Sequence, residues 1–199
     1  MLNKIQNSRI LLVFIVPLIL GLVSVLSFQP FNITLINFII FPILFLILSD
    51  INKRSKNKYR KKPYLKNFFF VGYCFGIGFF LSGTYWISYS LTFDENLKVL
   101  IPFSIMLIPL SLGLFFGLAT IFIGPFIKKD YPSLFIFCFI FSLIDYLRGN
   151  IFSGFPWNLW SYSWSWLVEI IQVLNPIGLY AFNSISIIFF CSPVILFFN

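Results

Sequence analysis

The chain contains no histidine among its 199 residues, and only 10% of its residues are charged. It therefore lacks the commonest metal ligand and the side chain that most often shuttles protons near neutral pH. Its three cysteines, Cys74, Cys138 and Cys191, lie far apart within apolar runs. Neither a disulfide framework nor a metal cluster is predicted from that spacing. We expect no metal and no cofactor, and we interpret the cysteines as small apolar side chains packed between helices.

A nucleophile with a general base beside it is also missing from the sequence pattern. Such a pair needs a serine or cysteine within reach of a base that is itself held in place. None of the three cysteines has such a neighbour, and the only lysine expected on the outer face is Lys98. No catalytic residue is therefore predicted in this chain.

The chain is rich in apolar residues, which make up 59% of it and form long runs. A helix needs about 20 apolar residues to cross a membrane. The sequence therefore predicts an all-α, polytopic membrane helix bundle of about six spanning helices. We expect the spans near residues 10–28, 33–49, 67–93, 99–127, 133–148 and 177–198, with a basic cytoplasmic loop at 50–66 and an outer interfacial loop at 149–170.

Basic residues indicate the orientation of the bundle. All 14 lysines and arginines except Lys98 and Arg148 fall on one side of the predicted spans, eight of them in the loop at 50–66. The positive-inside rule then places the N-terminus in the cytoplasm and the loop at 149–170 outside. The first apolar run ends without a small-residue cleavage pattern, so we expect an uncleaved anchor. The basic loop lacks an aromatic stacking platform, which argues against nucleic acid as a partner.

The outer loop is rich in aromatic side chains. Amphipathic rings settle at the level of the lipid headgroups, so we expect a lipid-interface loop or a shallow re-entrant element. The rings are Trp157, Trp160, Tyr162, Trp164 and Trp166.

Glycines recur in the third and fourth predicted spans, including Gly72 and Gly76 in one and Gly113 and Gly117 in the other. Glycines four residues apart let helix backbones approach closely in lipid. We interpret them as packing seams, with a groove for an acyl chain as the alternative.

The segment from Asp145 to Trp157 places charges at the end of an apolar span. Asp145 and Arg148 are three residues apart, so they share a helix face and can pair. Arg148 could bind a lipid phosphate, or it could extend to the headgroups as arginines at helix ends do. The sequence leaves both possibilities open.

Nearby residues extend this candidate site. Gly149 and Gly154 allow backbone turns that other residues disfavour, and Pro156 stiffens the approach to Trp157. Glu169 is a second carboxylate near the same face, and we interpret it as a solvated interfacial acid.

These residues carry a resemblance to a known family. The pattern of Leu147-Arg148-Gly149, four residues, and then Gly154-Phe155-Pro156-Trp157 resembles the signature of apolipoprotein N-acyltransferase. Other segments are similar to the family in the same order along nearly the whole chain. They are the turn at Leu26–Asn32, the glycine-rich span at Gly72–Ile87 and the opening of the last span at Pro176–Tyr180.

The resemblance implies a bacterial enzyme of the inner (cytoplasmic) membrane that moves an acyl chain from a phospholipid to the N-terminal cysteine of diacylated lipoproteins. The family has eight membrane helices and a nitrilase-like domain with a Glu-Lys-Cys triad. This chain matches only the first six helices, so we expect a fragment that is inactive alone unless another chain supplies the missing domain.

Residue by residue, the resemblance assigns Arg148, Gly154 and Trp157 to lipid entry and placement, with Asp145 and Pro156 beside them. Asp145 stands where the family usually has glutamate. Trp164 stands where it usually has glutamine, which leaves that contact undefined.

Two other functions stay open from the sequence. The chain could be a stand-alone, degenerate lipid- or lipoprotein-binding membrane module without activity. A transporter or channel subunit is disfavoured because charges that could line a path are nearly missing from the spans.

Overall fold

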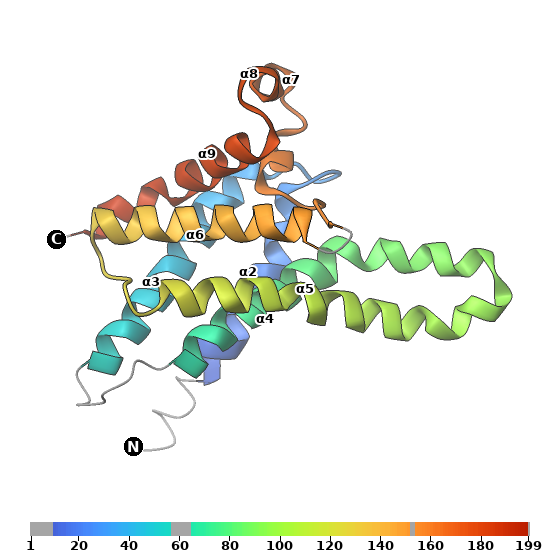
Figure 1. Ribbon diagram of the computed structural model, residues 1–199, viewed down its shortest axis with the longest axis horizontal. Helices are drawn as coiled ribbons and strands as arrows, with labels where there is room; N and C mark the ends of the chain where they lie inside the picture. Colours follow the sequence, from blue (N-terminus) through green and yellow to red (C-terminus); the bar gives the residue numbers. More distant parts are fainter. Residues whose placement is uncertain (1–9, 57–64, 152–153, 199) are drawn as a thin grey trace.

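The chain folds into a bundle of helices in the computed structural model, which describes residues 10–56, 65–151 and 154–198 (Figure 1). Those ranges contain no strand. The all-α membrane bundle expected from composition is confirmed. Five helical stretches in the described part are long and apolar enough to cross a membrane: Thr34–Ser55, Leu65–Phe93, Glu95–Ile123, Tyr131–Asn150 and Leu179–Phe197.

The first apolar run, where a span is expected at 10–28, is helical over nearly those residues. It forms a shorter apolar helix, Leu11–Ser27, made of three pieces. These are the π-helix η1 (Leu11–Ile15), the α-helix α2 (Val16–Ser24) and the 3₁₀-helix η2 (Val25–Ser27). Pro17 lies inside this helical stretch, directly after the π-helical turn, and its ring removes one backbone hydrogen-bond donor there. Phe28 is extended and ends the helix.

The remaining elements follow in chain order. They are η3 (Thr34–Ile36), α3 (Asn37–Lys56), α4 (Leu65–Thr84), η4 (Tyr85–Phe93), η5 (Glu95–Leu100), α5 (Ile101–Ile123), α6 (Tyr131–Asn150), η6 (Trp160–Trp164), α7 (Val168–Ile171), α8 (Leu174–Ile177), α9 (Leu179–Cys191) and η7 (Ser192–Phe197).

Several boundaries differ from those predicted, for local reasons. Helix α6 begins before residue 133 because Asp130 caps it, accepting a hydrogen bond from the Ser133 amide at 2.9 Å. Asp94 caps η5 in the same way through the Asn96 amide, also at 2.9 Å, so helical structure resumes directly after residue 94. Residues 57–64 of the predicted basic loop, together with Lys4 and Arg9, lie outside the described residues.

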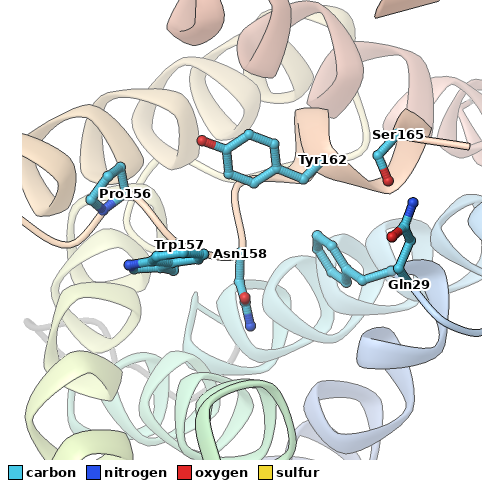
Figure 2. Close-up of a pocket in the computed structure, with 7 residues that line it drawn as sticks. Gln29, Pro156, Trp157, Asn158, Tyr162 and Ser165 are labelled. Atoms are coloured by element: carbon cyan, nitrogen blue, oxygen red, sulfur yellow. The ribbon is translucent and has the colours of Figure 1, made fainter. Parts of the chain in front are cut away.

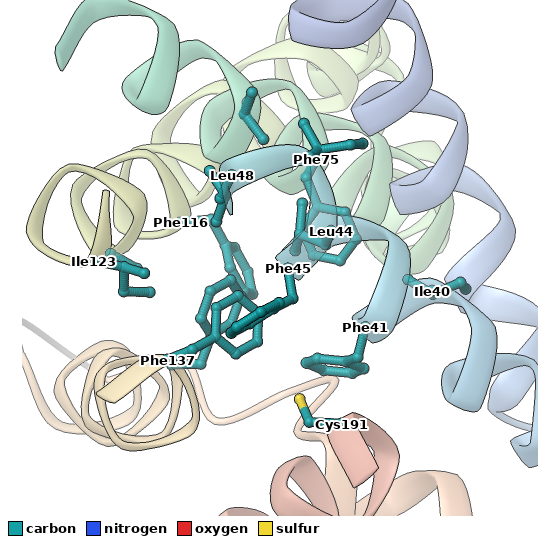
Figure 3. Packing of buried hydrophobic residues seen from close by; sticks show 14 of the residues in the cluster. Ile40, Phe41, Leu44, Phe45, Leu48, Phe75, Phe116, Ile123, Phe137 and Cys191 are labelled. Atoms are coloured by element: carbon teal, nitrogen blue, oxygen red, sulfur yellow. The ribbon is translucent and has the colours of Figure 1, made fainter. Parts of the chain in front are cut away.

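The core is a cluster of phenylalanine rings between α3, α4, α5, α6 and α9 (Figure 3). Phe41, Phe75, Phe116 and Phe137 are all fully buried in it. The rings of Phe41 and Phe137 meet edge to face at 6.5 Å, one of the geometries that aromatic quadrupoles favour. Cys191 packs beside this cluster, as expected for a small apolar side chain.

Glycines bring α4 into backbone contact with both α5 and α2. A Cβ atom at Gly72 would meet the carbonyl oxygen of Phe116, and one at Gly76 would meet the Cα atom of Gly113 at 2.8 Å. On the other face of α4, a Cβ atom at Gly78 would meet the backbone of Leu18. The packing-seam interpretation is confirmed at these positions, and the close approach leaves no room there for an acyl chain.

Replacing Gly76 with valine is expected to separate α4 from α5. Overpacking of this kind typically costs about 1–3 kcal/mol, so the unfolding temperature of the purified protein in detergent should fall clearly. The matched control is Ala181→Val at an exposed position of α9, which should change it little. An equal effect of the two substitutions would contradict the seam.

One part of the fold stands clear of the bundle. The hairpin formed by η4, η5 and the start of α5 projects to one side (Figure 1). Its apolar side chains are largely exposed, with Phe93 at 85% and Tyr89 at 69%. Its charged residues gather at the tip, where Lys98 pairs with Glu95 at 3.3 Å. Apolar arms of this kind suit contact with lipid better than contact with water.

Candidate functional site

The site is built on an ion pair inside the bundle. Asp145 and Arg148 lie one turn apart on α6, and the Arg148 Nη2 and Asp145 Oδ1 atoms are 3.1 Å apart, with both side chains fully buried. The pairing predicted from their spacing is confirmed. A buried pair of this kind needs further hydrogen bonds to offset the loss of hydration, and both residues make them.

Arg148 uses its second terminal nitrogen to hold the loop that follows α6. Its Nη1 atom donates to the carbonyl oxygens of Phe155 at 2.7 Å and Trp157 at 2.8 Å. The guanidinium also lies over the Phe80 ring, 5.1 Å from its centre, within the range of a cation–π contact. These contacts of the Arg148 guanidinium are with protein groups, and the side chain is buried. Arg148 fixes the backbone on both sides of Pro156.

A third residue, Asn183 on α9, joins the pair from the other side. Its Nδ2 atom donates to Asp145 Oδ2 at 3.0 Å, and its Oδ1 atom accepts from the Ser161 amide at 3.2 Å. The sequence pattern around Asn183 did not predict this role. The available signal was an amide side chain inside an apolar span, a position where polar groups almost always have partners.

The backbone between Arg148 and Trp157 turns sharply at Gly154. This glycine has a φ of +71°, and its amide donates to the Ile151 carbonyl at 3.0 Å. The predicted turn role is therefore correct for Gly154. It is wrong for Gly149, which is helical and instead leaves space for the Tyr180 hydroxyl group. A small residue is needed at both positions, for different reasons.

Trp157 is carried to the surface by this loop, where 53% of it is exposed. Its ring meets the Trp86 ring of η4 edge to face, with centres 5.7 Å apart. Asn158 follows with a φ of +56°, and its side chain packs against Gly83. The loop and the hairpin are thus joined at two indole rings.

Two cavities meet at Trp157, which lines both. The first, of about 440 Å³, has Trp157 and Gln29 on opposite sides with Tyr162 between them (Figure 2). Its lining consists of Phe28, Gln29, Pro156, Trp157, Asn158, Tyr162 and Ser165. The second, of about 410 Å³, lies between the loop and the hairpin and is lined by Trp86, Ile87, Tyr89, Ser90, Phe93, Phe155 and Trp157.

The two cavities differ in chemistry. The first adds two amide and two hydroxyl side chains to its apolar lining, whereas the second has no amide and is mostly aromatic, with hydroxyl groups only at Tyr89 and Ser90. Burial raises the pKa of the Tyr162 phenol, and the nearby Tyr180 adds to that rise, although Arg148 opposes it. Tyr162 therefore stays protonated at neutral pH and can donate a hydrogen bond. Among the residues that the structure describes, no basic side chain lines either cavity.

The expectation that every ring of the outer loop lies at the headgroups is wrong for Trp160. It is fully buried and contacts the rings of Phe79 and Phe41, each at 4.7 Å. The loop therefore dips into the core between Trp157 and Trp164. The sequence could not separate Trp160 from its neighbours, because all of them lie in one short run of aromatic and small polar residues.

The other predicted residues lie around this dip. Trp164 stacks on Phe190 at 5.4 Å, and the Trp166 indole N–H donates to Thr34 Oγ1 at 2.8 Å. Glu169 is exposed on the short helix α7, the position expected of a solvated acid. It lines neither of the two cavities.

A helical multi-pass membrane bundle with a buried arginine that holds an aromatic loop is the class of protein these features define. Residues 20–192 match the family model described as the apolipoprotein N-acyltransferase N-terminal domain, so the chain belongs to that family.

Curated relatives agree with this assignment. The apolipoprotein N-acyltransferase of Brucella melitensis is 30% identical over 88% of this chain and 33% of its own length. That of Rickettsia prowazekii is 33% identical over 87% of this chain and 32% of its own length. That of Rickettsia bellii is 38% identical over 59% of this chain and 23% of its own length. The chain thus spans at most about a third of the relatives it matches.

Proposed function

We propose that this chain is the membrane domain of an apolipoprotein N-acyltransferase and that its loop at 154–165 holds the phospholipid substrate in the outer leaflet of the bacterial inner membrane. One observation carries the proposal. Arg148, buried on α6, donates to the carbonyls of Phe155 and Trp157 and so fixes an exposed indole between two cavities.

The chemistry of the two cavities supports phospholipid as the ligand. A lipid has a polar head next to apolar chains, and Trp157 lies between a cavity with amide and hydroxyl groups and a more apolar, mostly aromatic one. We assign the head and glycerol region to the cavity of Gln29 and Tyr162, and an acyl chain to the cavity of Trp86 and Phe93. Tryptophan suits the wall between them because its ring is apolar and its N–H is polar.

The positive-inside distribution supports the orientation, with the N-terminus in the cytoplasm and Trp157 at the outer face. The second substrate in this proposal is a diacylated lipoprotein, which needs the same leaflet. Acyl transfer itself needs an activated nucleophile. We assign that role to a nitrilase-like domain, in a longer form of the protein or on another chain, so residues 1–199 alone should show no turnover. Acyl transfer by the isolated chain would overturn this part of the proposal.

Replacing Trp157 with alanine is expected to weaken phospholipid binding. Truncating a tryptophan at the centre of a binding site commonly costs a factor of about ten or more in affinity. Phospholipid retention can be measured by native mass spectrometry of the detergent-solubilised protein during lipid titration. Trp166→Ala is the matched control, since Trp166 is similarly exposed, at 46%, but lines neither cavity. Equal retention by the two variants would refute the assignment of this site.

A further inference from the structure

We infer that Asn183 is a positioning residue for the lipid site, acting on Trp157 through the loop rather than by touching the lipid. The inference rests on the proposed function and adds to it a residue on α9, a helix that contributes nothing to the lining of either cavity.

Asn183 and Arg148 share one carboxylate. Asp145 accepts from Arg148 through Oδ1 at 3.1 Å and from Asn183 through Oδ2 at 3.0 Å. Each partner then reaches the outer loop with another polar atom, Nη1 of Arg148 and Oδ1 of Asn183. Arg148 donates to the carbonyls of Phe155 and Trp157, and Asn183 accepts from the amide of Ser161.

The loop is therefore fixed at two places around Trp157. Arg148 holds the chain at and before this residue, and Asn183 holds it four residues later, next to the buried Trp160. The short stretch between these points includes Asn158, whose side chain packs against Gly83. Because the loop is held on both sides of Trp157, the position of the Trp157 ring relative to Trp86 is fixed. The shape of both cavities depends on that position.

An amide is suited to this position by its chemistry. A carboxamide donates through nitrogen and accepts through oxygen, so it can join a carboxylate to a backbone N–H without adding charge. An ionised carboxylate at position 183 could accept from Ser161 but could not donate to Asp145. Alanine could do neither. Asn183 is only 1% exposed, so water cannot easily replace these bonds.

The balance of charge among Asp145, Arg148 and Asn183 provides a specific test of this role. Asn183→Asp places two carboxylates beside one guanidinium, and Asp145→Asn leaves Arg148 without its counter-ion. The exchange variant that combines Asp145→Asn with Asn183→Asp restores one carboxylate, one amide and one guanidinium in the same buried space. A residue that only fills volume would not gain from that exchange, because the side chains are nearly equal in size.

The experiment compares wild type, Asn183→Ala, both single charge variants and the exchange variant, with Ser184→Ala as control. Ser184 bonds only within its own helix, to the Tyr180 carbonyl. Phospholipid affinity is measured by lipid titration, and amide hydrogen exchange is measured over residues 154–161. Asn183→Ala should bind phospholipid about tenfold more weakly, the typical effect of losing hydrogen bonds to a charged group, and should exchange faster in the loop. Ser184→Ala should match wild type.

The exchange variant should recover most of the affinity lost by the two single charge variants. Additive losses, with no recovery, would overturn the inference. So would Asn183→Ala with wild-type affinity and wild-type loop exchange. If Asn183→Ala fails to fold, the recovery of phospholipid affinity in the exchange variant tests the inference by itself. Failure of the wild-type protein to retain phospholipid would instead refute the proposed function, and the loop exchange rates would still test the link between Asn183 and the loop.

Discussion

Arg148→Leu is expected to destabilise the protein more than any other single change of a charged residue in the described part. It leaves Asp145 buried without its cation and frees the carbonyls of Phe155 and Trp157 from their donor. Breaking a buried pair by removing one partner typically costs about 3–5 kcal/mol. The unfolding temperature of the purified protein should fall sharply, and phospholipid retention should be lost with it.

A double variant separates the charge effect from the loss of volume. Replacing both members, as in Asp145→Leu with Arg148→Leu, removes the stranded carboxylate, and apolar replacement of a whole buried pair is often close to neutral. The double variant should therefore be more stable than Arg148→Leu, although its loop is no longer held and its phospholipid retention should stay low. An Arg148→Leu protein as stable as wild type would show that the pair is not buried as described.

Trp160→Ala is expected to have a comparable effect on stability for a different reason. Its ring is fully buried and contacts Phe41, Phe75 and Phe79. Removing a large aromatic side chain from a core typically costs about 3–5 kcal/mol, because the surrounding atoms only partly fill the cavity. Thermal unfolding in detergent measures the effect directly.

Trp166→Ala supplies the comparison, since it removes the same side chain from a half-exposed position six residues later. It should cost clearly less than Trp160→Ala, although it gives up the hydrogen bond to Thr34. Two variants of equal stability would mean that the loop does not dip into the core at Trp160.

The sequence predicted the parts of this fold that follow from local pattern. Apolar length predicts most of the spans, and the helical period predicts that Asp145 and Arg148 pair. Glycine spacing predicts the seam between α4 and α5, which contacts at Gly76 and Gly113 bear out. Each of these depends on residues that are close along the chain or that repeat along one helix.

What the sequence could not predict depends on where the loop goes after α6. The two other acceptors for Arg148 are backbone carbonyls, and carbonyls are the same at every residue. Asn183 lies 38 residues beyond Asp145 and meets it only because α9 packs on α6. Trp160 shares its neighbourhood with three other tryptophans, so only the path of the backbone shows that it alone is fully buried.

The central claim is that the loop presents Trp157 to lipid, and fluorescence quenching tests it most directly. Wild type and Trp157→Phe are reconstituted into phosphatidylcholine vesicles, either with or without bromine on the acyl chains. Bromine quenches the fluorescence of indole rings that touch those chains. The account predicts that the emission lost in Trp157→Phe is strongly quenched in brominated vesicles, whereas the emission of the buried Trp160 persists. Emission from Trp157 that is the same in both kinds of vesicle would contradict the account.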